Sequence, residues 1–213
     1  MKILLIKKKL YNEFHNYQIS LDEFFINNFN TSKIIKNNIK YVEYNNNNLG
    51  GGSNIDLIFN ITELSKSKLV LETGVAYGYS SLFFLKSLKQ RNGKLISINL
   101  PYPDSKKEKY IGKAVTNDLF KYWKFYSGAD RDLLPKILGK NNSFDIFHYD
   151  SDKSYHGKFW ALNLVWPYIR KNGFLICDDI QDNFAFIDFT KIIKKDPEII
   201  NYNSKFIGIV KKT

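Results

Sequence analysis

The feature that most constrains this chain is an alternation of short apolar runs with longer amphipathic segments, which begins near residue 55. Short apolar runs bounded by turn residues predict buried strands, and helical spacing of apolar residues predicts helices. Alternating strands and helices form a parallel sheet with right-handed crossovers. The strands are predicted at residues 69–71, 94–98, 123–126, 144–149 and 173–177, and helices at 80–85, 159–169 and 184–193.

The C-terminal residues predict a β-hairpin, with strands at 198–202 and 206–210 joined through Asn203 and Ser204. Such a hairpin adds an antiparallel strand to the parallel sheet. The expected fold class is therefore α/β, a Rossmann-like doubly wound sheet of about seven strands, mostly parallel with an antiparallel C-terminal strand. In a sheet of this kind, ligands bind outside the carboxyl ends of the strands.

The first part of the chain has a different composition from the rest. Residues up to about 48 are rich in Asn, Lys and aromatic residues with weak helical periodicity. The glycines at 50–52 predict a flexible connection between this segment and the rest of the chain. A chain of 213 residues suits one core of ordinary size. We therefore expect an N-terminal helical cap with a glycine-rich connection over residues 1–54, and one ligand-binding domain over residues 55–213.

Composition restricts the compartment and the partners. The chain has 32 Lys plus Arg against 21 Asp plus Glu, a net charge of +11, which favours acidic partners or else a solvated lysine-rich surface. The single cysteine, Cys177, excludes an intramolecular disulfide, and its apolar flank predicts a buried strand thiol in a reducing cytoplasm. The apolar run at residues 3–6 is too short for a signal peptide, and we expect no membrane partner.

The turn after the first predicted strand carries the first chemical signal. It runs from Glu72 to Ser80 with glycines at Gly74 and Gly78, a Glu-x-Gly-x-x-x-Gly pattern. Glycines let the backbone pass close to a ligand, and the following helix start offers free N–H groups to an anion. Glu72 would then face a ligand's ammonium group. A purely structural turn is the alternative, and the Gly-x-Gly-x-x-Gly form of nicotinamide enzymes is absent.

Acidic residues follow the fourth and fifth predicted strands. Asp150, Asp152 and Lys153 come after the fourth strand, and Asp178 and Asp179 come after the fifth. In a doubly wound sheet these strand ends lie near the first strand, so Asp150, Asp178 and Asp179 are expected to converge. Three carboxylates repel one another unless a hard divalent cation or a cationic ligand lies among them. The alternative is that Asp179 or Asp182 simply caps the next helix.

The order of these motifs resembles that of class I S-adenosylmethionine-dependent methyltransferases. The resemblance is strongest to the metal-dependent catechol and caffeoyl-CoA O-methyltransferases and their bacterial relatives, and it covers residues 69–180. The motifs that carry it are Glu72-x-Gly74 with Gly78-Tyr79-Ser80, Gly128-Ala129-Asp130-Arg131, Asp150-x-Asp152-Lys153, and Asp178-Asp179 in place of the family's Asp-Asn pair.

The resemblance implies a role for each matching residue. Lys153 would be the general base, with its pKa lowered by a nearby divalent ion. Asn99 stands where the family has an acidic residue for the ribose hydroxyls, and Asp104 is the alternative there. His148, on the same strand as Asp150, is interpreted as a packed core histidine. The cofactor would be held by Glu72, Gly74, Ser80, Asn99, Asp130 and Asp150, and Mg²⁺ or another divalent cation by Asp150, Asp178 and Asp179.

The expected function is an S-adenosylmethionine-dependent methyltransferase that performs metal-assisted O-methylation of a small molecule or sugar hydroxyl, with anionic acceptors among the candidates. One alternative is a nucleic-acid methyltransferase, which only the charge favours, because no Asn-Pro-Pro-Tyr-like base pocket is present. The other is a catalytically silent Rossmann-like binding module, which should lack the acidic constellation. The sequence leaves the acceptor and the oligomeric state open, a homodimer included.

Overall fold

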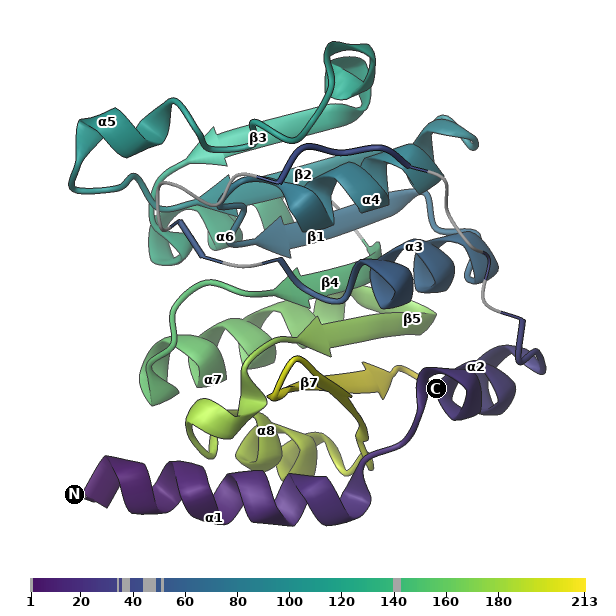
Figure 1. The fold of residues 1–213 in the computed structure, drawn as a ribbon, viewed down its shortest axis with the longest axis vertical. Coiled ribbons are helices and arrows are strands. Elements are labelled where there is room, and N and C mark those ends of the chain that lie inside the picture. Colours follow the sequence, from purple (N-terminus) through teal and green to yellow (C-terminus); the bar gives the residue numbers. More distant parts are fainter. Residues whose placement is uncertain (1, 34, 36–38, 44–48, 51, 140–142) are drawn as a thin grey trace.

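The fold is known from a computed structural model, which describes residues 2–33, 35, 39–43, 49–50, 52–139 and 143–213. Its strands are β1 (Leu69–Thr73), β2 (Lys94–Asn99), β3 (Trp123–Ser127), β4 (Phe144–Tyr149), β5 (Ile169–Cys177), β6 (Glu198–Tyr202) and β7 (Lys205–Lys211). They form a seven-stranded sheet in the order β3-β2-β1-β4-β5-β7-β6 (Figure 1). The α/β Rossmann-like prediction is therefore confirmed.

Strand directions also agree with the prediction. Strands β1 to β5 pair in parallel, and β7 runs antiparallel to both β5 and β6. The β6–β7 hairpin turns at Asn203 and Ser204, which both have positive φ. The chain order reverses between β1 and β4, which places a topological switch point at their carboxyl ends, where a doubly wound sheet binds its ligands.

Helices cover both faces of the sheet. The α-helices are α1 (Lys2–Tyr17), α2 (Leu21–Phe29), α3 (Ile55–Leu64), α4 (Tyr79–Lys89), α5 (Ser105–Glu108), α6 (Asp130–Leu138), α7 (Tyr155–Val165) and α8 (Ala185–Ile193). Short 3₁₀ turns are η1 (Asn117–Tyr122), η2 (Trp166–Tyr168) and η3 (Ile180–Asp182).

The helix predicted at residues 159–169 is displaced toward the N-terminus in the structure, so both predicted ends are wrong. Helix α7 begins at Tyr155 because the Ser154 side chain accepts a hydrogen bond from the Gly157 backbone N–H at 3.0 Å. It ends before Pro167, which lacks the N–H that a helix interior needs. Strand β5 then starts at Ile169, earlier than predicted.

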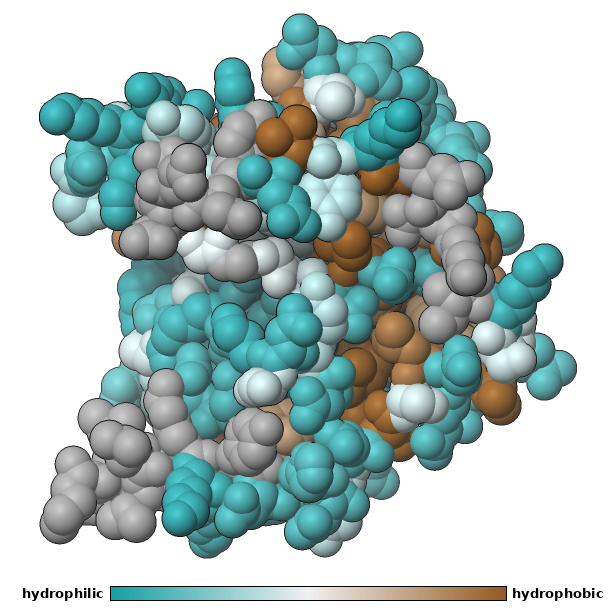
Figure 2. Space-filling view, in the orientation of Figure 1, coloured by the Kyte–Doolittle hydropathy of each residue, from teal (hydrophilic) through white to brown (hydrophobic). Residues whose placement is uncertain are grey.

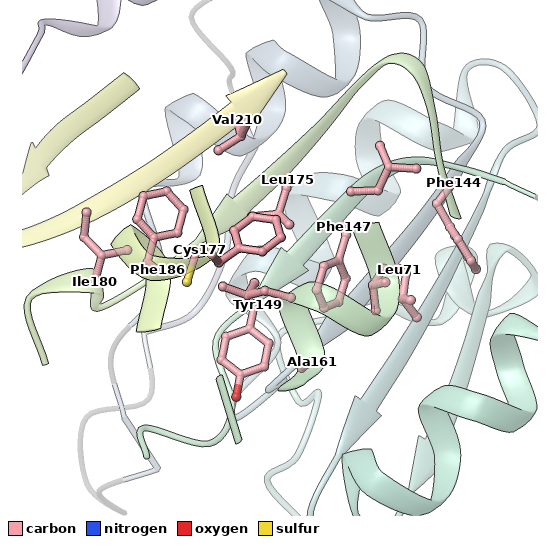
Figure 3. Close-up of a cluster of buried hydrophobic side chains, with 14 of the residues drawn as sticks. Leu71, Phe144, Phe147, Tyr149, Ala161, Leu175, Cys177, Ile180, Phe186 and Val210 are labelled. Atoms are coloured by element: carbon pink, nitrogen blue, oxygen red, sulfur yellow. The ribbon is translucent and has the colours of Figure 1, made fainter. Parts of the chain in front are cut away.

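Alternating strand residues supply two buried layers. On one face, Phe147 and Leu175 pack with residues of α6, α7 and α8. On the other face, Ile146 and Phe174 pack with residues of α2, α3 and α4. Figure 3 shows part of the first layer, with Cys177 among apolar side chains, so the predicted buried strand thiol is confirmed.

The N-terminal helices contribute to both layers. Leu10 and Phe14 of α1 are buried in the first layer, and α1 contacts η3 and β6. Phe24 of α2 is buried in the second layer, with its ring 6.3 Å from that of Phe174. A helical N-terminal segment is thus present, whereas a domain division at residue 54 stays a prediction.

The outer surface in Figure 2 is mostly hydrophilic, with hydrophobic side chains gathered near α2 and α3. Within the described part of the chain, every helix is too short or too polar to cross a membrane. The cytoplasmic compartment and the oligomeric state stay predictions.

Candidate active site

A cavity of about 570 Å³ opens outside the carboxyl ends of β1, β2, β4 and β5. Small-molecule sites typically have volumes of about 300–1,000 Å³. Figure 2 shows the surface hollowed on this side of the molecule, at the left of the view. The described walls are formed by residues 49–50, 99–103, 129–131 and 150–153, together with Gly74, Ala76, Gly157, Trp160, Asp179 and Lys205.

The glycine turn after β1 forms one wall. Gly74 has a φ of +85°, a left-handed conformation that side chains rarely adopt. Its N–H donates to the carbonyl of Ile98 at 2.9 Å, and a Cβ at this position would overlap the carbonyl oxygen of Asp150. Gly74 is therefore required where the ends of β1 and β4 meet, and it lies in the wall of the cavity, whereas its cofactor role stays a prediction.

Glu72 lies beneath the turn, outside the described lining of the cavity. Its fully buried carboxylate accepts hydrogen bonds from the hydroxyls of Ser80 and Ser81, both at 2.5 Å, and of Ser97 at 2.8 Å. Ser80, the other residue expected to hold the methionine end of the cofactor, is thus bonded to Glu72. These two side chains could affect a ligand only indirectly, by fixing the conformation of the turn. Their cofactor role stays a prediction.

His148 is a further partner of the buried Glu72 carboxylate. It is fully buried, with Nδ1 3.6 Å from Glu72 Oε1 and Nε2 3.5 Å from Asp178 Oδ1. Burial alone would lower the pKa of His148, but the charges of Asp178 and Glu72 outweigh it and raise the pKa to about 10. The raised pKa favours the protonated form of the imidazole, which lies between two carboxylates. Its burial agrees with the prediction from the sequence, whereas its pairing with Glu72 and Asp178 was not predicted.

Asn99 lies in the wall after β2, and its amide holds the glycine turn. Its Oδ1 accepts from the N–H groups of Val75 at 2.8 Å and Ala76 at 3.2 Å, while its Nδ2 donates to the carbonyl of Leu100 at 2.8 Å. Asp104, the alternative for ribose binding, instead accepts from the Lys106 N–H at the start of α5 and is outside the described lining.

Asp130 opens α6 at another wall of the cavity. Its Oδ2 accepts a hydrogen bond from the Ser151 hydroxyl at 2.5 Å, and burial raises the pKa of its carboxyl. The neighbouring Arg131 guanidinium lies over the Trp160 ring, 5.2 Å from its centroid. The segment that resembles an adenine-side motif thus presents a carboxyl group and a cation–aromatic pair to the cavity.

Lys153 bridges two carboxylates in the cavity wall. Its ammonium pairs with Asp150 and lies 2.7 Å from Asp179, which also pairs with Lys205 at 3.1 Å. Burial would lower the pKa of Lys153, but the charges of Asp150 and Asp179 outweigh it and raise the pKa above its ordinary value. Burial would raise the pKa of Asp179, yet Lys153 and Lys205 lower it to about 2. In this arrangement the pKa of Lys153 is thus raised, whereas the lowering expected beside a divalent ion stays a prediction.

The three carboxylates predicted to hold a metal lie at neighbouring strand ends with different partners. Asp150 pairs with Lys153, whereas Asp178 accepts from the Ser53 hydroxyl at 3.1 Å and faces His148. Burial and the charge of Asp178 raise the pKa of Asp150 to about 6. Among the described residues, no group of three or more His, Cys, Asp or Glu side chains is arranged to hold a metal ion. These side chains do not fit a divalent ion as they are placed.

A fully buried lysine that the sequence analysis missed supports the turn after β5. Lys158 of α7 donates to the carbonyl oxygens of Asp178 at 3.1 Å and Asp179 at 2.7 Å. Asp179 has a φ of +51°, and its side chain makes no capping hydrogen bond to η3. Asp179 therefore occupies the N-cap position of η3, as the capping alternative expected, but its side chain makes no capping hydrogen bond and pairs with the two lysines instead.

A family model described as a methyltransferase domain matches residues 71–180. A catechol O-methyltransferase of Niastella koreensis is 29% identical over 111 residues, which cover 50% of this chain and 48% of the relative. The chain thus matches about half the length of this curated relative.

Solved structures share the fold at low identity. An O-methyltransferase from Bacillus cereus in complex with S-adenosylhomocysteine has a TM-score of 0.61 and 15% identity, with 93% of this chain and 100% of that chain covered. A provisionally assigned caffeoyl-CoA O-methyltransferase from Staphylococcus aureus has a TM-score of 0.64 and 15% identity. The match covers 97% of this chain and 99% of that chain. These likenesses confirm the methyltransferase fold.

Proposed function

This chain belongs to the methyltransferase domain family, and from that membership we propose that it transfers a methyl group from S-adenosylmethionine to an oxygen of a small molecule or sugar. One observation carries the proposal: the cavity at the switch point gathers Gly74, Asn99, Asp130, Asp150 and Lys153 in its walls. These are the positions to which the resemblance gives cofactor and catalytic roles. A volume of about 570 Å³ for cofactor and acceptor together favours a small acceptor.

The cofactor would supply an activated methyl group on its sulfonium, and the chain would hold and orient it. The turn at Gly74 brings backbone to the cavity without a side chain in the way. Asn99 would lie near the ribose, although its amide oxygen is shared with the turn. Asp130 and the Arg131–Trp160 pair would lie at the adenine.

Lys153 would act on the acceptor oxygen. An ammonium held by Asp150 and Asp179 can orient and stabilise an oxygen that carries negative charge. The general-base role has a further requirement, because a protonated amine cannot accept a proton. A bound ligand would first have to draw Asp150 or Asp179 away from the ammonium, which would let the pKa of Lys153 fall. The described carboxylates do not fit a metal ion as they are placed, so the acceptor oxygen would be oriented by Lys153 itself.

Cofactor binding tests this proposal directly. Calorimetry is expected to show saturable binding of S-adenosylhomocysteine that is weakened at least about 100-fold by Gly74→Ala, because the new Cβ overlaps Asp150 and left-handed strain alone amounts to about 1–3 kcal/mol. Gly139→Ala is the matched control, since a Cβ there makes only ordinary contact. Thermal unfolding of both variants separates lost binding from lost folding. Saturable binding of NADH without any response to S-adenosylhomocysteine would contradict the proposal.

A further inference from the structure

Two lysines from distant parts of the chain meet at one carboxylate. Lys153 follows β4 and bridges Asp150 and Asp179, whereas Lys205 starts β7 and reaches the other oxygen of Asp179 at 3.1 Å. Lys205 lies outside the region that the family model matches. Both lysines line the cavity, so their charges belong to the site itself.

Asp178, the third of the carboxylates predicted to hold a metal, is held by residues other than the two lysines. Asp178 Oδ1 accepts from the Ser53 hydroxyl and lies 3.5 Å from His148 Nε2, and His148 in turn lies beside Glu72. Its backbone carbonyl accepts from the buried Lys158 ammonium. Asp178 would have to leave His148 and Ser53 before its oxygens could join those of Asp150 and Asp179.

A divalent ion at this site would need carboxylate oxygens that already pair with lysine ammonium groups. Mg²⁺ requires oxygen ligands at about 2.0–2.1 Å in near-octahedral geometry. The Lys153 ammonium already lies between Asp150 and Asp179, and the Lys205 ammonium takes the remaining oxygen of Asp179. A metal ion at this place would have to displace both ammonium groups and would be repelled by them until it did.

We propose that Lys153 and Lys205 take the place of a divalent ion at this site, so that the carboxylate group is neutralised from within the protein and binds no metal. The assignment of methyl transfer to this site rests on the proposed function, whereas the lysine–carboxylate arrangement does not. Lys205 thereby gains a role in the site that its position at the start of a hairpin strand does not suggest.

Manganese binding measures this directly, because the electron paramagnetic resonance signal of free Mn²⁺ is lost when the ion binds. The wild-type protein is expected to show no binding up to about 1 mM Mn²⁺, the weak end for protein sites of hard divalent ions, with or without saturating S-adenosylhomocysteine. The double variant Lys153→Met with Lys205→Met removes both ammonium groups and keeps similar chain lengths. It is expected to gain saturable Mn²⁺ binding, tighter by at least about 10-fold.

Lys89→Met is the matched control. Lys89 also pairs with a carboxylate, Asp118 at 2.8 Å, but that carboxylate stands apart from the group, so its release should create no Mn²⁺ site. Lys205→Met alone, with a side chain 59% exposed, should fold and show a smaller gain than the double variant.

Two results would overturn the inference. The first is saturable binding of Mn²⁺ to the wild-type protein with a dissociation constant of about 1 mM or below, in either cofactor state. The second is a folded Lys205→Met or double variant that binds Mn²⁺ no better than the wild type. Failure of S-adenosylhomocysteine to bind would instead remove the proposed function and leave the metal result standing.

Discussion

Replacement of Lys153 by Met is expected to lower turnover on the true acceptor by about two to four orders of magnitude and to leave the affinity for S-adenosylhomocysteine little changed. The substitution keeps much of the aliphatic stem and removes the ammonium that Asp150 and Asp179 hold at the cavity. A positioned acid, base or charge acts mainly in the transition state, so the loss should appear in turnover. Steady-state kinetics and calorimetry on the same preparation measure the two quantities.

Lys153→Arg distinguishes the two roles that the amine could have. Arginine keeps the positive charge, and its pKa is too high for it to release a proton near neutral pH. Retention of much of the turnover in Lys153→Arg would identify a fixed charge that orients the acceptor oxygen. A loss equal to that of Lys153→Met would identify a general base. Near-normal turnover in the Met variant would move the role to another residue and leave the methyltransferase proposal intact.

The parts of the site that the sequence predicted depend on local pattern. Gly74 lies where a glycine follows a buried strand and precedes a helix, and no other residue fits its left-handed backbone there. Asp150 follows a strand whose buried residues are evident in the sequence, and Asp130 follows the aromatic strand β3, so their place at the carboxyl ends follows from the sheet. Strand direction was predictable for a related reason, because alternating strands and helices allow few topologies.

The parts that could not be predicted depend on contacts between distant segments. Lys158 and Lys205 are two among 32 Lys and Arg residues, and nothing near them in the sequence separates a buried or paired lysine from a solvated one. Lys205 reaches Asp179 only because the hairpin returns beside β5. Asp150, Asp178 and Asp179 follow neighbouring strands, which the sequence indicated, but the lysines and the histidine that pair with them come from contacts that the sequence does not show.

The partners of His148 illustrate the same limit within the sheet. Glu72 and His148 are paired in the register of β1 and β4, and Ser97 of β2 lies opposite Glu72. This register places their side chains together, although they are far apart in the sequence. A glutamate in a glycine-rich turn motif therefore has two possible environments, the ligand above the turn or the polar group beneath it, and only the fold distinguishes them.

Substitution of Glu72 by Ala is expected to lower the free energy of unfolding by about 3–5 kcal/mol, the range for removing one partner of a buried ion pair. Three serine hydroxyls and one side of the His148 imidazole would lose their acceptor inside the protein. Urea unfolding followed by circular dichroism measures the change. Asp118→Ala, which breaks a surface pair with Lys89, is the control and should change stability little.

A double-mutant cycle then tests whether Glu72 acts through His148. Once Glu72 is gone, the buried imidazole has lost one of its two counter-charges, so adding His148→Leu should destabilise the protein by less than His148→Leu does alone. The cofactor affinity of Glu72→Ala, measured where the variant is folded, should fall only as far as the turn is disturbed. If Glu72→Ala instead unfolds at the wild-type urea concentration while binding of S-adenosylhomocysteine collapses, the carboxylate faces the ligand as the resemblance implied, and its place beneath the turn is wrong.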